Sequence, residues 1–169
     1  HLTRNRILLH LVDMAPYDGV EPADAALSIV RELERFSPTL AQRERWLVLN
    51  KSDLVDDETF AARREAVLTA LDWKGPVYSI SAIRSEGTDA LCGALMTYLE
   101  ECRAREAADP ELLEAEQLLQ TRMQEEARER IAELRARYRR GPEEEIDDDD
   151  DFDDDFDDDE FDVEVEYVP

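Results

Sequence analysis

Two short polar segments carry the side chains of this sequence that could do chemistry. The first is NKSD at residues 50–53, and the second is SAI at residues 81–83. Each follows an apolar run typical of a buried strand, at 45–50 and at 77–80. The carboxyl ends of parallel strands meet at one edge of a sheet, so we expect both segments to face the same ligand. The candidate site residues are Asn50, Lys51, Ser52, Asp53, Ser81, Ala82 and Ile83.

Asp53 has a side chain suited to reading one nucleobase. A carboxylate can accept two hydrogen bonds side by side, which matches the N1 hydrogen and the 2-amino group along one edge of guanine. Adenine offers neither donor, because its N1 is an acceptor and it has no 2-amino group. Two charge-assisted hydrogen bonds of this kind give a preference on the order of a hundredfold. The sequence therefore predicts guanine binding at Asp53.

Alternating strands and helices are needed to hold these segments in place. Apolar runs predict strands, and stretches with helical spacing of apolar residues follow each of them. This order is the βαβ pattern of a parallel sheet with helices on its faces, an α/β fold. The predicted strands are 6–13, 45–50 and 77–80, and the predicted helices are 22–36, about 57–72 and 88–102.

A different pattern begins after residue 104. Asp109, Pro110 and Glu111 form a good helix start, and Gly141 with Pro142 forms a good stop. Apolar residues recur between them at mostly helical spacings. The segment predicts one long amphipathic helix, or two, which lies either on the domain or on a partner. The apolar positions are Leu112, Leu119, Met123, Ile131, Leu134 and Tyr138.

The net charge of −24 is concentrated at the end of the 169-residue chain. Residues 143–169 hold 18 Asp and Glu residues and no Lys or Arg, which leaves −6 for the rest. Such a segment cannot bury enough apolar surface to offset its chain entropy and self-repulsion, so we expect it to be disordered. The two cysteines have no paired spacing, and no apolar run approaches 18 residues. A reducing, cytoplasmic setting without membrane binding fits best.

The polar segments resemble known motifs. NKSD is similar to the NKxD base-recognition motif of the GTPase superfamily, and SAI is similar to its second guanine element. The stretches RILLHLVDMAPYDG, RWLVLNKSDL and SISAIRSEGTDAL, with an acidic C-terminus, resemble the Obg (CgtA) family of bacterial GTPases. This resemblance implies that Asp53 holds the guanine edge and that Asn50 contacts the base and braces the phosphate loop. It also implies that the Lys51 stem lies over the ring, that Ser81 orients Asp53, and that the Ala82 N–H meets the guanine O6.

The resemblance carries further expectations about the whole protein. Residues 1–104 would be the guanine-recognition half of an Obg-type P-loop GTPase domain, 105–142 a helical extension and 143–169 an acidic disordered tail. The chain would be part of a longer, monomeric GTPase that binds GTP and GDP, with ppGpp as a further candidate ligand. It would hydrolyse GTP slowly and act in large ribosomal subunit assembly, stress response and cell-cycle control, without binding DNA.

The sequence contains no phosphate loop of the form GxxxxGK[ST]. We therefore expect the Mg²⁺ ligands to lie outside this chain, and we assign it no catalytic residue and no metal ligand. Hydrolysis by these residues alone is not expected. The DxxG-like Asp72-Trp73-Lys74-Gly75 follows the NKxD-like segment, whereas in the family DxxG precedes NKxD. We interpret it as a helix end and turn.

Three other residues favour structural roles over chemical ones. Asp13 ends the first predicted strand in DMAPYDG, where a turn is a simpler explanation than a metal ligand. His10 lies in an apolar strand, and we expect a core histidine with satisfied hydrogen bonds. Cys92 lies on a predicted helix, and we expect it to be a small apolar filler.

Two alternatives remain open. The chain could belong to another ribosome-associated GTPase of the same superfamily. It could instead be an interaction module in which the 110–140 helix and the tail form a partner-binding arm. The tail itself either supplies solubility or docks on a basic ribosomal protein surface, and the spacing of Phe152, Phe156 and Phe161 among acids favours docking. Direct RNA binding by the tail is not expected, since like charges repel.

Overall fold

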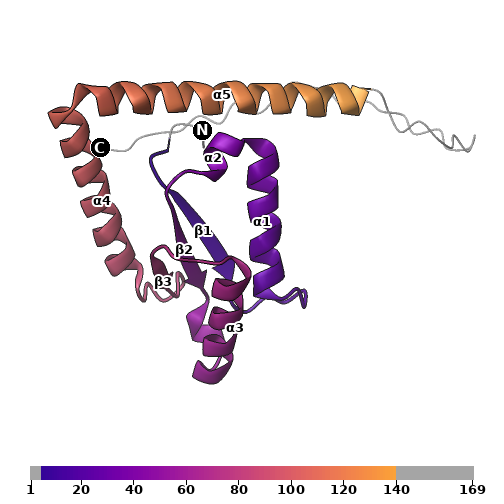
Figure 1. The fold of residues 1–169 in the computed structure, drawn as a ribbon. Helices are drawn as coiled ribbons and strands as arrows, with labels where there is room; N and C mark the ends of the chain where they lie inside the picture. Colours follow the sequence, from indigo (N-terminus) through magenta and orange to yellow (C-terminus); the bar gives the residue numbers. More distant parts are fainter. Residues whose placement is uncertain (1–4, 140–169) are drawn as a thin grey trace, which may run out of the picture.

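The computed structural model describes residues 5–139 and contains a three-stranded sheet in the order β1-β2-β3. The strands are β1 (Leu8–Asp13), β2 (Arg45–Asn50) and β3 (Val77–Ser79), and both pairs are parallel. Figure 1 shows helices around this small sheet, as in an α/β fold. The predicted acidic tail at 143–169 lies outside the described residues.

Helices connect the strands and follow the last of them. The helices expected at 22–36, at about 57–72 and after Asp109 have closely similar bounds in the structure, whereas the helix expected at 88–102 continues to residue 108. Its continuation is explained by good helix formers up to Ala108, and it stops before Pro110 because proline disfavours helical backbone in the preceding residue. The short helix at 38–41 and the 3₁₀ turn at 52–54 were not predicted. None of the helices within residues 5–139 is long and apolar enough to cross a membrane. The helices are α1 (Pro22–Phe36), α2 (Pro38–Ala41), the 3₁₀ turn η2 (Ser52–Leu54), α3 (Asp57–Ala70), α4 (Thr88–Ala108) and α5 (Pro110–Arg139).

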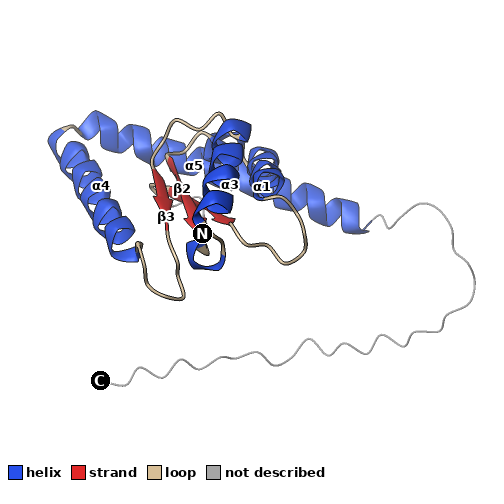
Figure 2. Cartoon of the chain, turned by 90° about the horizontal axis from the view of Figure 1, so that it is seen from below, coloured by secondary structure: helices blue, strands red, loops and turns tan. Residues whose placement is uncertain are grey.

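The central strand β2 is buried on both faces, because helices cover both sides of it. Leu47 and Leu49 pack in the cluster beneath α1 and α3, which includes Val67. Trp46 and Val48 point the other way, into the cluster formed with α4. Figure 2 shows α4 on one side of the strands and α1 and α3 on the other. This three-layer arrangement fixes the direction in which β2 and its carboxyl end point.

His10 is buried on β1, as the sequence predicts, but its hydrogen bonds are not satisfied. Neither ring nitrogen has a hydrogen-bond partner among the described residues. Burial, followed by the nearby Arg45 guanidinium, lowers the pKa of His10 to about 4. The expectation of a satisfied core histidine is therefore wrong for the part of the chain that the structure describes.

The expectation that Cys92 is a small apolar filler is also wrong. Its side chain is exposed on α4, so it is not an apolar filler. The inner face of the same helix is formed by Leu91, Leu95 and Tyr98, which pack toward Trp46 and Val48. Cys92 directly follows Leu91, and a step of one residue turns it about 100° away from that face.

The turn interpretation of Asp72–Gly75 is confirmed. After α3 ends, Asp72 adopts a left-handed conformation with φ of 44°. The Trp73 N–H donates to the Leu68 carbonyl at 2.9 Å, and the Asp72 N–H donates to the Thr69 carbonyl at 3.1 Å. This pair of hydrogen bonds is the Schellman motif that ends many helices.

Helix α5 lies on the domain, across the amino ends of the strands (Figure 1). Met123 from its middle is fully buried against Leu8 and Leu40. Beside it, Glu126 accepts hydrogen bonds from the Ser37 hydroxyl at 2.6 Å and from the Thr39 N–H and hydroxyl at 3.0 and 2.6 Å. Of the two placements that the sequence leaves open, the structure therefore has the middle of α5 on the domain.

Glu126 is an unusually acidic carboxyl. Partial burial alone would raise its pKa, but the hydrogen bonds from Ser37 and Thr39 and the charge of Arg122 lower the pKa to about 2. The carboxylate form of Glu126 is therefore the form that holds α5 against α2.

Replacing Glu126 with Ala should lower the free energy of unfolding by about 2 to 4 kcal/mol, because three hydrogen bonds to a charged acceptor are lost and their donors are left unpaired. Urea denaturation followed by circular dichroism measures this change. Glu125→Ala is the matched control, because Glu125 is exposed on the same helix, and it should change the free energy by less than about 0.5 kcal/mol. Equal effects of the two substitutions would contradict the role given to Glu126.

His10 should make stability fall between pH 7 and pH 5. The unfolded chain binds a proton at His10 near pH 6.5, whereas the folded chain does not until the pH nears 4. The unfolded state therefore binds more protons in this range, and the free energy of unfolding should decrease by about 2 kcal/mol.

The comparison with His10→Leu isolates this contribution. Leu cannot titrate, so the free energy of unfolding of the variant, measured by urea denaturation, should fall much less between pH 7 and pH 5. The remaining change in both proteins reports the other titrating groups. The same pH dependence in the two proteins would exclude His10 as its source.

Candidate functional site

The NKSD and SAI segments lie side by side at the carboxyl edge of the sheet. The Ile80 N–H donates to the Leu49 carbonyl at 2.8 Å, and the Ile80 carbonyl accepts from the Ser52 N–H at 3.1 Å. These two hydrogen bonds continue the β2–β3 pairing beyond the regular strands. They bring the two predicted segments together, as the parallel arrangement requires.

Asn50 joins the two segments through its side chain. Its Oδ1 accepts a hydrogen bond from the Ala82 N–H at 3.1 Å. Its backbone carbonyl accepts from the Met14 N–H at 3.0 Å, so the loop after β1 is attached as well. The N–H that the family resemblance assigns to the guanine O6 thus already has a protein partner here.

Lys51 is held by the residue that ends β1. Its backbone is left-handed, with φ of 67°, and its Nζ lies 2.6 Å from Asp13 Oδ2. Asp13 Oδ1 accepts from the Ala15 N–H at 2.9 Å, which confirms the turn predicted there. Partial burial would raise the pKa of Asp13, but Lys51 and the Ala15 N–H outweigh it and keep that pKa below its usual range. Three loops therefore meet at this edge.

Asp53 carries a buried carboxylate oxygen without a hydrogen-bond partner in the described part of the chain. Its side chain is only 3 % exposed, in the turn η2. Oδ2 lies 3.3 Å from Arg84 Nε, but Oδ1 is buried and has no hydrogen-bond partner among the described residues. The Ser81 hydroxyl, and to a lesser extent Arg84, lower the pKa of Asp53. Asp53 is thus a carboxylate that could accept further hydrogen bonds from a ligand.

Ser81 is fully buried at the base of a closed loop. Its N–H and carbonyl pair with the carbonyl and N–H of Glu86 at 3.0 and 3.1 Å. Its Oγ accepts from the Arg84 N–H at 3.3 Å, which leaves the hydroxyl proton free to point at Asp53. The orienting role that the resemblance implies for Ser81 stays a prediction.

The remaining predicted residues contribute less through their side chains. Ser52 serves the site through its backbone N–H, and Ala82 does the same. Ile83 is 88 % exposed, in the loop between Ser81 and Glu86.

Two residues of the site were not predicted from the sequence. Arg84 covers Asp53 with a side chain that is 57 % exposed. Gly87 has φ of 75°, and a Cβ placed there would lie 2.5 Å from the Ser79 carbonyl oxygen. The Gly after the SAI segment is a turn signal that could have indicated Gly87. The direction of the Arg84 side chain has no comparable signal, because it depends on tertiary contact.

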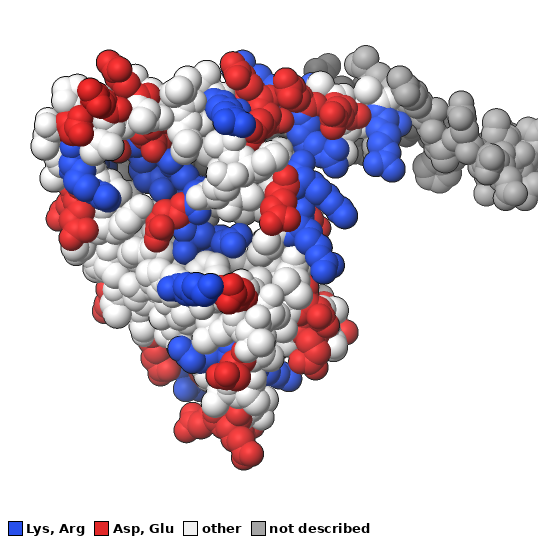
Figure 3. All heavy atoms as spheres, in the orientation of Figure 1, with Lys and Arg blue, Asp and Glu red and all other residues white. Residues whose placement is uncertain are grey.

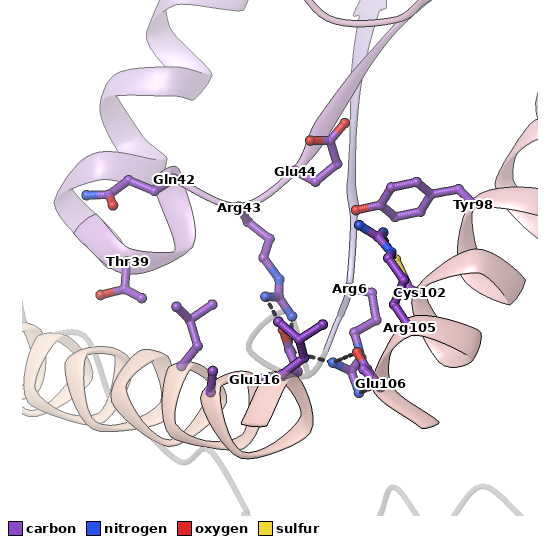
Figure 4. A pocket seen from close by; sticks show the side chains of 13 residues that line it. Arg6, Thr39, Gln42, Arg43, Glu44, Tyr98, Cys102, Arg105, Glu106 and Glu116 are labelled. Carbon is purple, nitrogen blue, oxygen red and sulfur yellow. Dashed lines mark hydrogen bonds and ion pairs between the residues drawn. The ribbon is translucent and has the colours of Figure 1, made fainter. Parts of the chain in front are cut away.

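A cavity lies away from this site, where α4 and α5 meet the amino ends of the strands (Figure 4). Its volume is about 420 Å³. Arg43 forms a two-point ion pair with Glu116, and Arg6 lies 2.7 Å from Glu106 and 3.0 Å from Glu116. These charges are neutralised within the chain and join α4 and α5 to the sheet. We therefore assign this cavity a structural role.

A scan against models of known protein families finds no match for this chain. We therefore infer what the site can do from the side chains that form it. The site combines a buried carboxylate, an amide and a lysine, which are all groups that can form hydrogen bonds with a polar ligand. Within residues 5–139 no three acidic, His or Cys side chains lie together as a metal site.

Gly87→Ala should destabilise the protein by about 2 kcal/mol or more, because the added Cβ collides with the Ser79 carbonyl and requires an unfavourable left-handed backbone. Gly93→Ala is the control, since nothing lies within 4 Å of a Cβ there and alanine favours the helix. Thermal denaturation compares the two. Retention of full stability by Gly87→Ala would show that the loop can rearrange, and would contradict the fixed geometry described for Ser81.

Proposed function

We propose that this chain is the guanine-nucleotide-binding part of an Obg-type GTPase. The observation that carries the proposal is the buried Asp53 carboxylate at the carboxyl end of β2, whose Oδ1 has no partner among residues 5–139. An unmet buried acceptor is costly unless a ligand satisfies it. The edge of guanine offers two parallel N–H donors, and this is the group we assign to Asp53.

Arg84 and the base would compete for Asp53 Oδ2. The contact between Arg84 and Asp53 is 3.3 Å long, and the Arg84 side chain is more than half exposed. Because the Arg84 side chain reaches solvent, it can leave Asp53 and give its place to a ligand. In the proposed complex Arg84 turns outward, and both carboxylate oxygens accept from the base.

Asn50, Lys51 and Ser81 support this arrangement. The Ser81 hydroxyl lowers the pKa of Asp53, which favours its carboxylate form, and would orient that carboxylate toward the base. Asn50 holds the SAI segment beside NKSD, and the Ala82 N–H that it engages can be shared with the guanine O6. Lys51 is fixed by Asp13, with its aliphatic stem available to cover the ring.

The phosphate-binding half is proposed to belong to sequence outside this chain. Strand β1 pairs with β2 on one side and with no strand on the other within the described residues. Its Leu9 and Leu11 are 37 % and 52 % exposed, which is unusual for a parallel strand. A further strand and helix, carrying the phosphate loop and the Mg²⁺ ligands, would cover them.

The wider biological role follows from the resemblance of the sequence alone. The intact protein would hydrolyse GTP slowly to GDP in the cytoplasm and assist assembly of the large ribosomal subunit. It would also act in stress response and cell-cycle control, with ppGpp as a further candidate ligand. Another ribosome-associated GTPase of the same superfamily would use the same base site.

Asp53→Asn should change the base preference of the complete protein. An amide can donate one hydrogen bond to the 2-oxo group of xanthine but cannot accept both guanine donors. We expect GDP binding to weaken on the order of a hundredfold and XDP binding to strengthen. Competition of both nucleotides against a fluorescent GDP analogue measures the change.

Asp57→Asn is the control, because Asp57 is an exposed carboxylate on the first turn of α3, near the site but outside it. It should leave both affinities within about twofold. If Asp53→Asn keeps the preference of the original protein for GDP over XDP, Asp53 does not read the base and the proposal fails.

A further inference from the structure

Charge is divided unevenly along α5. Residues 110–127 contain five Glu and one Arg, whereas residues 128–139 contain five Arg and two Glu. In Figure 3, which has the orientation of Figure 1, Lys and Arg side chains gather below the C-terminal half of this helix, near α1. The second half of α5 is therefore a basic surface on a protein whose net charge is −24.

An apolar groove of about 580 Å³ runs beside this basic surface, between α1 and the second half of α5. Ile29 and Leu134 among its lining residues are each 46 % exposed. Arg35 and Arg130 also line it, and Arg130 Nη1 lies 3.1 Å from Glu133 Oε2 on the same helix. Large apolar side chains that share one groove are typical of a binding surface. The lining residues are Ile29, Glu32, Leu33, Arg35, Phe36, Arg130 and Leu134.

We infer that this groove and the basic surface of α5 bind the acidic segment of the same chain, residues 143–169. The segment is complementary to this surface in charge and in the kinds of side chain it carries. The segment has 18 acidic residues for the arginines, and Phe152, Phe156 and Phe161 for the apolar walls. Acidic repeats with interleaved aromatic residues can place a ring in a groove while the carboxylates meet basic side chains.

The segment is long enough to reach the groove. Leu134 precedes Arg139, the last residue of α5, by five positions, which is about 8 Å along a helix. Phe156 follows Arg139 by 17 positions, and that length of chain spans up to about 56 Å when extended. Covalent attachment keeps the segment at an effective concentration near millimolar, so weak contacts suffice for docking.

This docking depends on charge and is reversible. Each exposed ion pair contributes little, and salt screens all of them. While the segment is docked, it covers the arginines of α5 and keeps other anionic partners from them. The inference does not depend on guanine binding, which involves the opposite edge of the sheet.

A photo-cross-linking experiment on the full 169-residue chain tests the inference. Phe156 is replaced by p-benzoylphenylalanine, the chain is irradiated, and the linked peptides are identified by mass spectrometry. We expect a product of monomer size in which position 156 is joined to residues 29–36 or 130–134. Raising NaCl from 0.05 to 0.5 M should lower its yield about fivefold.

Arg35→Glu should lower the same yield about fivefold, because it reverses the charge of a residue that lines the groove. Arg103→Glu is the matched control, since Arg103 is an exposed arginine near the end of α4, away from the groove. It should leave the yield unchanged. Cross-links spread over the surface, equal effects of the two variants, or groove cross-links found only in products of dimer size would each overturn the inference.

Discussion

The two hydrogen bonds of Ile80, to Leu49 and from Ser52, are the constraint on which the candidate site depends. They extend the pairing of β2 with β3 by the few residues needed to bring NKSD and SAI into contact. Every other feature of the site builds on this pairing. Asn50 can reach the Ala82 N–H, and Ser81 can reach Asp53, only because the two loops leave the sheet at the same level.

The opposite end of the sheet is organised by helix α5. Met123 and Glu126 attach its middle to α2 and β1, and the Arg43–Glu116 pair attaches its first half. The second half extends past α1 and carries the groove and the basic surface. The molecule thus has a polar site at the carboxyl edge of its sheet and a separate charged surface at the amino edge. The two regions share the sheet but no side chains.

Features fixed by local sequence were predictable, and features fixed by tertiary contact were not. The strands, the helix starts and the polar NKSD and SAI segments follow from apolar periodicity and capping residues, and the parallel sheet follows from their order. The unpaired nitrogens of His10, the exposure of Cys92 and the position of Arg84 depend on what other elements place beside them. Glu126 is the clearest case, because nothing near it in sequence indicates that its partners are Ser37 and Thr39.

The most direct test of the central claim is an NMR titration of the 169-residue chain with GMP and, separately, with AMP. Both ligands carry the same phosphate and ribose, so a difference between them reports the base. The account predicts that GMP shifts the amide signals of residues 50–53 and 81–84, and that AMP shifts them far less. Equal shifts with both nucleotides, or shifts confined to the cavity around Arg6 and Tyr98, would contradict it.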